Sequence, residues 1–383
     1  MVPHSPQRKV GGLRAESYRW YDCYDRLCRI LASSMLRFSG KQFVTILSRV
    51  LVRDALWRKI MVRRARSADV VEIHNRPSYV FDLRRSGYRG RIILHMHNDL
   101  ADYITRDKFP QLESEVDDFV FCSAFIMRRA ITHFAAPSSA GASLANRSRV
   151  LYNGVSSRYE KLGERNPLLL MYAGRVNADK GVLEVIRVCD NLAARGYDVS
   201  LEVLGGTGSG KSNPETPYLR RVHEEAARAN ARHARSLIKL AGPVEYSEVV
   251  SRMSEASLLI LPSRWEEPFG MVAVEAMSAG VIPVVADRGG LPEVVGEAGS
   301  VVQYFEEPEA QVDQFVEVVE QLLSSPIPES SRDYARSRAA TFGWGAIARD
   351  AGNMLTGNSD SGDLGSKAHG AEMFSDAAEE SCP

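Results

Sequence analysis

No apolar run in this 383-residue chain approaches the roughly 18 residues of a transmembrane helix, and its first residues lack the apolar core of a signal peptide. The five cysteines are odd in number and scattered, so they form neither a disulfide framework nor a paired C-x-x-C metal site. Charge is balanced, with 48 Lys and Arg against 48 Asp and Glu, which gives no general reason to expect nucleic-acid binding. These absences predict a cytoplasmic protein without a nucleic-acid partner.

The balanced total conceals a basic N-terminal segment. Residues 1–66 contain 15 Lys and Arg but only 4 Asp and Glu, whereas the rest of the chain contains 33 and 44. Residues 18–66 are typical of helices, with apolar side chains among many arginines. Two interpretations stay open for them: peripheral contact with the anionic inner face of the plasma membrane, or a helical surface packed on a neighbouring sheet.

Short apolar runs rich in Val, Ile and Phe alternate with helical intervals in two successive stretches of the chain. Such an alternation indicates parallel sheets covered on both faces. Because this alternation occurs in two successive stretches, we predict an α/β protein with two Rossmann-like domains, divided just before Pro167. The expected strands lie within residues 68–77, 91–99, 117–124, 149–155, 168–175, 199–206, 236–244, 257–263, 280–287 and 299–304.

The two ends of the chain differ from this pattern. No buried strand precedes Gly11-Gly12, so the first domain, residues 1–165, is expected to lack its first strand or to be an N-terminally shortened version. The second domain covers residues 166–331. A final helix is expected over residues 332–355, interrupted at Phe342-Gly343-Trp344, and the Ser/Gly/Asp-rich tail over 356–383 is predicted to be disordered.

The strongest motif is the segment 265–276, which follows a strand and therefore lies at the carboxyl edge of the second sheet. Phe269-Gly270 is expected to open a helix that runs to Ala279, whose free first amides favour an anion. Glu267 precedes this helix and Glu275 lies in its second turn, so the two carboxylates can reach different hydroxyl groups. Acidic residues that merely complement a helix dipole would explain Glu267 but not Glu275.

A second motif, residues 173–181, leaves the first strand of the second domain. Arg175 and Lys180 then project over the same sheet edge. An arginine fork and a lysine point charge suit a diphosphate, although two solvated surface cations are the alternative.

Together these segments read G-R-x4-K-G (174–181), E-P-F-G-x4-E (267–275) and R-G-G-L-P-E (288–293). This set resembles the retaining glycosyltransferases of family four, which have the GT-B fold: two Rossmann-like domains facing a central cleft, with a C-terminal helix that crosses back to the first domain. The resemblance covers about residues 68–350. It implies that Arg175 and Lys180 hold the donor diphosphate, that Glu267 meets the donor sugar and that Glu275 binds the ribose. It places further donor contacts at Gly174, Gly205, Phe269, Gly270 and Met271.

The first domain resembles the family more loosely. Its Asn75-Arg76-Pro77 and His97-Asn98 are similar to a subset with spore-coat and cell-surface polysaccharide transferases. The resemblance implies that His97 lies near the reacting centre and that Gly11-Gly12 corresponds to a donor-side glycine loop. His95 and His97 share one strand face and could bind zinc, but no third ligand accompanies them at a telling spacing, so no metal is expected.

A third motif, Gly205 to Ser212, matches the letters of a phosphate loop. A true phosphate loop continues directly into a helix, whereas Pro214 and Pro217 follow here. We therefore interpret the segment as a glycine loop beside the donor site.

These observations predict a retaining hexosyltransferase. It takes a nucleotide diphosphate sugar as co-substrate and transfers the sugar to a glycan, lipid-linked or other cell-envelope acceptor. No metal or cofactor is expected, because Arg175 and Lys180 can neutralise the diphosphate. Two alternatives stay open: a non-catalytic sugar-nucleotide-binding protein with a degenerate first domain, and a phosphate-loop NTPase.

Overall fold

The computed structural model describes residues 59, 62–65, 67–134, 140–156, 164–208 and 213–356. Residues 67–71 and 81–90 contribute to one compact unit, and residues 72–80 and 91–356 contribute to a second unit, which holds most of both sheets. Gly11-Gly12, most of the basic region 18–66 and the tail after residue 356 lie outside the described residues. No helix among the described residues is long and apolar enough to cross a membrane.

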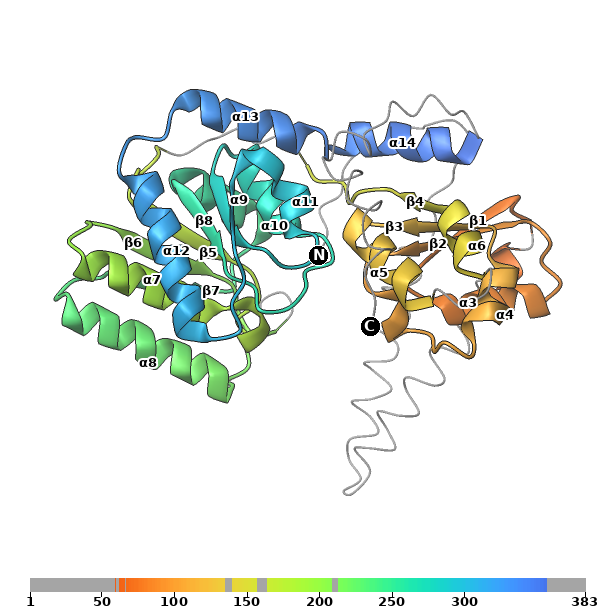
Figure 1. Cartoon of the computed structure of the whole chain (residues 1–383), viewed down its shortest axis with the longest axis horizontal. Helices are drawn as coiled ribbons and strands as arrows, with labels where there is room; N and C mark the ends of the chain where they lie inside the picture. The colour runs from red at the N-terminus through yellow and green to blue at the C-terminus, as the bar shows by residue number, and fades with distance from the viewer. Residues whose placement is uncertain are drawn as a thin grey trace, which may run out of the picture. The chain divides into compact units, whose positions relative to one another are not determined.

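The first sheet has the strand order β1-β2-β3-β4 among the described residues (Figure 1). Strands β2, β3 and β4 pair in parallel. β2 is buried from its second residue onward, as expected of a strand covered on both faces. The elements are β1 (Val70–His74), α3 (Pro77–Arg85), β2 (Arg91–Met96), η1 (Leu100–Asp102), α4 (Phe109–Glu115), β3 (Asp118–Phe121), α5 (Ala124–Phe134), α6 (Ala140–Asn146) and β4 (Ser148–Val150).

The second sheet is parallel throughout, in the order β10-β9-β8-β5-β6-β7. The first strand of the set, β5, lies in the middle, and the chain extends the sheet first on one side and then on the other. The elements are β5 (Leu169–Ala173), η2 (Ala178–Lys180), α7 (Val182–Ala194), β6 (Ser200–Leu204), α8 (Pro217–Arg232), β7 (Ile238–Gly242), α9 (Tyr246–Glu255), β8 (Leu258–Leu261), α10 (Met271–Ser278), β9 (Ile282–Ala286), α11 (Leu291–Val295), η3 (Gly296–Ala298), β10 (Ser300–Val302) and α12 (Pro308–Leu323).

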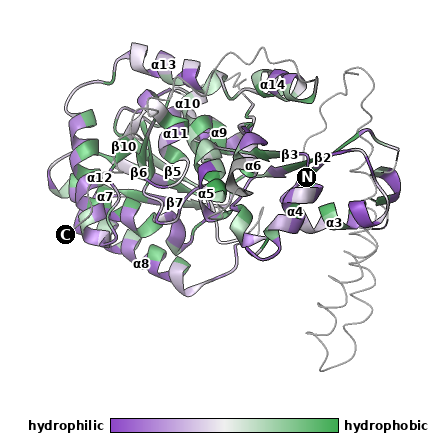
Figure 2. Ribbon diagram, turned by 45° about the vertical axis from the view of Figure 1, so that its right-hand side comes forward, coloured by the Kyte–Doolittle hydropathy of each residue, from purple (hydrophilic) through white to green (hydrophobic). Residues whose placement is uncertain are grey.

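Helices cover both faces of the second sheet. Figure 1 shows α7, α8 and α12 on one side of it and α9, α10 and α11 on the other. β8 and β9 are buried along their whole length, which explains their continuous apolar sequence. Figure 2 shows the hydrophobic residues gathered on the strands, with hydrophilic residues on outer helices such as α8. The predicted α/β fold with two parallel sheets is confirmed.

The C-terminal segment forms two helices, α13 (Glu329–Ala340) and α14 (Trp344–Thr356). They are separated at Phe342-Gly343, as the interruption in the sequence predicted. Ile347 of α14 packs in a buried cluster with Ile93 and Val120 of the first sheet and with Leu151, which directly follows β4. The last helix therefore returns to the first domain, and the predicted return is confirmed.

Candidate functional site

The strand order of the second sheet creates a switch point between β5 and β8. At such a point the loops that follow the two strands turn in opposite directions and leave space at the carboxyl edge, where open α/β sheets bind ligands. The loop after β5 contains Gly174, Arg175 and Lys180, and the loop after β8 contains Glu267. The sequence motifs therefore meet at one place in the sheet.

Lys180 and Glu267 form an ion pair across this switch point, between Lys180 Nζ and Glu267 Oε1. Each side chain is only 15% exposed, so water screens the pair weakly. Ser263 Oγ donates to the same carboxylate oxygen at 3.0 Å, and Lys180 Nζ lies 4.9 Å from the centre of the Trp265 ring. Arg175 is exposed on the same loop, and its carbonyl accepts a hydrogen bond of 2.8 Å from Tyr172.

The glycines of the R-G-G segment hold the backbone of Glu267. Gly290 N donates to Glu267 O at 2.6 Å. A Cβ atom added to Gly289 would lie 2.2 Å from the same oxygen, and Gly289 has a φ of +67°. Only glycine fits this close approach without displacing the Glu267 loop. The sequence motif signalled these residues, but not this role for them.

Helix α10 begins at Met271, and Gly270 precedes it as a left-handed N-cap residue. The predicted helix start at Phe269-Gly270 is therefore one to two residues early. Phe269 is 2% exposed, and its ring packs against Phe342, 5.6 Å between centroids. Its side chain is consequently part of the core, and only its backbone is available to a ligand.

Glu275 is buried in α10, as expected of a carboxylate on an otherwise apolar helix. The Tyr246 hydroxyl donates to Glu275 Oε1 at 3.0 Å. Burial raises the pKa of the Glu275 carboxyl, and the hydrogen bond from Tyr246 opposes that shift. Sequence reasoning missed Tyr246, because nothing in its spacing connects it to Glu275.

Gly205 brings the loop after β6 against the loop after β5. A Cβ atom added to Gly205 would lie 1.8 Å from Gly174 O, and Val176 N donates to Gly206 O at 3.0 Å. Residues 213–216 are not helical, and α8 begins at Pro217 with Thr216 as its N-cap. The prediction that this segment lacks the helix of a phosphate loop is confirmed, while Lys211 lies outside the described residues.

A second group of titratable side chains lies at the end of the first sheet. His95 Nδ1 hydrogen-bonds to Glu72 Oε1, His97 Nε2 to His74 Nδ1, and His97 Nδ1 to Asn153 Oδ1, each at 2.8 Å. Burial, followed by the neighbouring imidazole of His95, lowers the pKa of His97 to about 4. Burial also lowers the pKa of His74. The sequence indicated no third ligand beside His95 and His97, yet the structure places His74 there.

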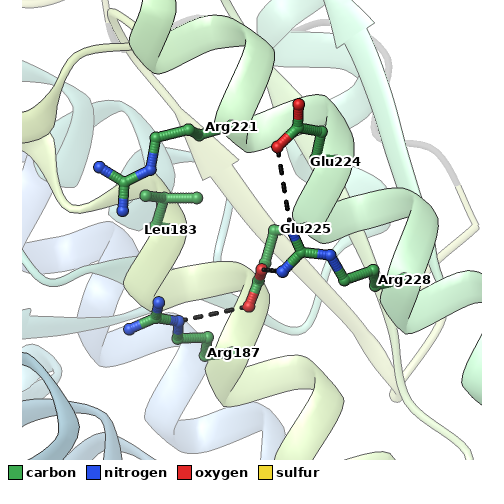
Figure 3. A pocket seen from close by; sticks show the side chains of 6 residues that line it. All are labelled: Leu183, Arg187, Arg221, Glu224, Glu225 and Arg228. Carbon is green, nitrogen blue, oxygen red and sulfur yellow. Dashed lines mark hydrogen bonds and ion pairs between the residues drawn. The ribbon is translucent and has the colours of Figure 1, made fainter.

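Figure 3 shows a hollow elsewhere on the surface, between α7 and α8. Glu225 forms ion pairs with Arg187 and Arg228, and Glu224 pairs with Arg228. These charges satisfy one another, and none of the predicted site residues lines the hollow. The switch point is therefore the better candidate site.

The fold and the loops at the switch point define a GT-B glycosyltransferase architecture. The model of the family described as glycosyl transferases group 1 matches residues 158–341, which include the loops at the switch point. This segment belongs to that family.

Relatives extend the similarity beyond the segment. The chain is 28% identical over 308 residues to spore coat protein SA of Bacillus subtilis strain 168, covering 74% of this chain and 76% of that protein. It is 25% identical over 237 residues to the lipopolysaccharide 1,2-N-acetylglucosaminetransferase of Salmonella typhimurium. That match covers 59% of this chain and 56% of that protein.

Solved structures support the fold. An α,α-trehalose-phosphate synthase (UDP-forming) from Burkholderia xenovorans superposes with a TM-score of 0.60 at 17% identity, covering 81% of this chain and 77% of that one. The structure of Anabaena HepE in complex with UDP and glucose superposes with a TM-score of 0.57 at 18% identity. The superposition covers 78% of this chain and 80% of that one.

Proposed function

We propose that the protein is a retaining hexosyltransferase that uses a nucleotide diphosphate sugar. The observation that carries the proposal is the buried pairing of Lys180 with Glu267 at the switch point, beside the start of α10. The Lys180 ammonium, the Glu267 carboxylate and the first amides of α10 thus lie together at the switch point, in loops with the motifs of the family. The names of the relatives favour a glycan or other cell-envelope acceptor. We propose that the transfer takes place on the cytoplasmic side of the membrane.

The proposed chemistry depends on stabilising a departing diphosphate. Arg175 and Lys180 face the negative charge that grows as the glycosidic bond breaks, and the first amides of α10 add to their effect. No divalent metal is needed at the diphosphate. We propose that the leaving phosphate takes the acceptor proton on the same face of the sugar, which gives retention.

The two carboxylates have different proposed tasks. Both described hydrogen bonds that the Glu267 carboxylate accepts reach its Oε1 atom, so we assign Oε2 to the sugar hydroxyls. Glu275 is assigned to the ribose hydroxyls. Its low-dielectric surroundings make each hydrogen bond that it accepts stronger than in water.

His97 is proposed to line the sugar side of the site as a fixed, neutral ring. Its two ring nitrogens are engaged by Asn153 and His74, so the ring is held in place rather than left free to transfer a proton. Its depressed pKa keeps it uncharged at neutral pH. Gly11-Gly12 would approach the site from outside the described residues.

Steady-state kinetics with a panel of nucleotide sugars test the proposal. Arg175→Ala should lower kcat by about 10²-fold or more, because its charge acts mainly in the transition state. Glu275→Ala should chiefly raise the donor KM, because ribose contacts contribute about equally to the bound donor and the transition state. Arg228→Ala, on the exposed face of α8, is the control and should change neither.

The reverse split, with Glu275→Ala abolishing turnover at saturating donor and Arg175→Ala raising only KM, would contradict these roles. Donor binding without transfer to any acceptor would favour a non-catalytic sugar-nucleotide-binding protein. Magnesium-dependent ATP hydrolysis that requires Lys211 would overturn the assignment to a transferase.

A further inference from the structure

Three imidazoles from two neighbouring strands gather at the end of the first sheet. His74 ends β1, His95 lies in β2 and His97 follows it. Each offers a ring nitrogen, and these ligand atoms all lie within 4.8 Å of one another. The set is therefore compact enough for one ion to reach all three.

One set of ring tautomers satisfies all three hydrogen bonds of the cluster. Asn153 Oδ1 accepts from His97 Nδ1, and the Glu72 carboxylate accepts from His95 Nδ1. His97 Nε2 must then accept the hydrogen bond from His74 Nδ1. In this set of tautomers each ring is neutral and has its lone pair on Nε2, and His74 Nε2 lies 3.5 Å from Glu72 Oε1.

This is the arrangement that metal-binding histidines usually have. A ligating imidazole donates its other N–H to a carboxylate or a carbonyl oxygen, which orients the ring and raises its basicity. Glu72 does so for His95, and Asn153 does so for His97. The outer partners of two ligands are therefore already in place.

The Nε2 atom of His95 supplies independent evidence. His95 is 5% exposed, and its Nε2 atom has no hydrogen-bond partner among the described residues. A buried polar atom without a partner is uncommon in proteins, and an ion is one of the groups that can satisfy it.

Backbone strain marks the same place. Asn75, directly after His74, has a φ of +50°, which is uncommon for a residue other than glycine. Its amide N–H donates to His95 O at 3.0 Å, and its Oδ1 accepts from His97 N at 2.8 Å. One strained residue thus ties together the backbones that carry all three imidazoles.

We propose that His74, His95 and His97 form a binding site for a divalent transition-metal ion, with zinc as the best match. Neutral imidazole nitrogens suit zinc, and three protein ligands leave a fourth tetrahedral position for an oxygen ligand. Zinc–nitrogen bonds of about 2.0–2.1 Å separate tetrahedral ligand atoms by roughly 3.4 Å. The ligand atoms lie within 4.8 Å of one another, and binding of an ion by His97 Nε2 would replace the His74–His97 hydrogen bond.

The site goes beyond the proposed transferase function and does not depend on it. In the proposed transferase function, Arg175 and Lys180 bind the donor diphosphate, and this ion does not. A bound ion would also keep His97 neutral and fixed, as its proposed role requires.

Zinc titration of the full chain, first freed of metal by a chelator, tests the proposal. The probe is the metal alone, measured by competition with a chromophoric chelator, and the bound zinc is counted by elemental analysis. We expect one ion per chain with a submicromolar dissociation constant. Cobalt should give the intense visible absorption of a tetrahedral site.

Single variants assign the ligands. His74→Gln and His95→Gln should weaken binding by at least about 100-fold, and Glu72→Gln by roughly 10–100-fold, the range for loss of an outer partner. The matched control is His223→Gln, an exposed histidine of α8, which should bind zinc like the unaltered chain. Circular dichroism of the metal-free variants checks that they fold.

Weak or absent zinc binding by the unaltered chain would overturn the proposal. Equal binding by the chain and by a triple His74→Gln, His95→Gln, His97→Gln variant would also overturn it. If the variants do not fold, X-ray absorption of the zinc-loaded chain decides. Three imidazole ligands would support the site, and fewer than three would refute it.

Discussion

Replacing Lys180 by methionine should destabilise the second domain even without any ligand. The substitution keeps most of the volume of the side chain but removes its charge, so the Glu267 carboxylate, 15% exposed, loses its counter-ion. Breaking a buried ion pair from one side costs about 3–5 kcal/mol. Ser263 still donates to Glu267, so we expect the lower end, about 3 kcal/mol.

The measurement is a thermal unfolding series on four proteins: the unaltered chain, Lys180→Met, Glu267→Gln and the double variant. About 3 kcal/mol corresponds to a drop in Tm of roughly 6–12 °C in a domain of 150–250 residues. The double variant should recover much of this loss, because it no longer buries an unpaired charge. Its kcat should nevertheless stay about 10²-fold low, because the diphosphate still lacks the cation.

Lys239→Met is the matched control. Lys239 is 64% exposed and pairs with Glu202, which keeps Arg252 as a second partner. We expect a loss below about 1 kcal/mol. If the effects of Lys180→Met and Glu267→Gln simply added within about 0.5 kcal/mol, the two groups would not be energetically coupled. Recovery of kcat in the double variant would refute the catalytic role of Lys180.

Two further predictions concern pH and backbone geometry. Burial raises the pKa of Glu275 in the folded chain above its ordinary value of 4.5. The folded unaltered chain therefore loses stability as the pH rises from about 4.5 to that higher pKa, because the buried carboxyl becomes charged. Glu275→Gln should therefore raise Tm at about pH 8 but not below about pH 4, and an equal Tm gain at both pH values would contradict the linkage. Gly205→Ala should lower Tm far more than Gly87→Ala. Both glycines have a positive φ, but only at Gly205 would the added Cβ clash with the backbone, 1.8 Å from Gly174 O. Similar losses in melting scans would show that the loop yields to the clash.

The fold was predictable because a parallel strand that is buried on both faces has a continuous apolar sequence, which can be recognised within a few residues. Leu258–Leu261 and Ile282–Ala286 are apolar on both faces, and glycine ends the intervening helix at Gly280, where φ is +71°. The two carboxylates proposed for the site stood out in the sequence for a related reason. A glutamate such as Glu275 conflicts with an apolar helix, and that conflict is visible in a single segment.

The missed residues belong to contacts between distant segments. His74 meets His95 and His97 because β1 and β2 are neighbouring strands, and the spacing of 23 residues between His74 and His97 carries no periodic signal. Tyr246 reaches Glu275 from a different helix, 29 residues away. Side-chain contacts of this kind depend on tertiary packing, which composition and periodicity do not encode.

The pair between Lys180 and Glu267 also has a consequence for the order in which the chain is made. Its members are 87 residues apart, and β6, β7 and β8 are all synthesised between them. At about 5–20 residues per second, Lys180 leaves the ribosome roughly 4–17 s before Glu267. During that interval the nascent chain contains Lys180 without its counter-charge, Glu267. The pair can form only after β8 has been added beside β5, so anion binding by a ribosome-bound chain would report the addition of β8, before β9 and β10 are made.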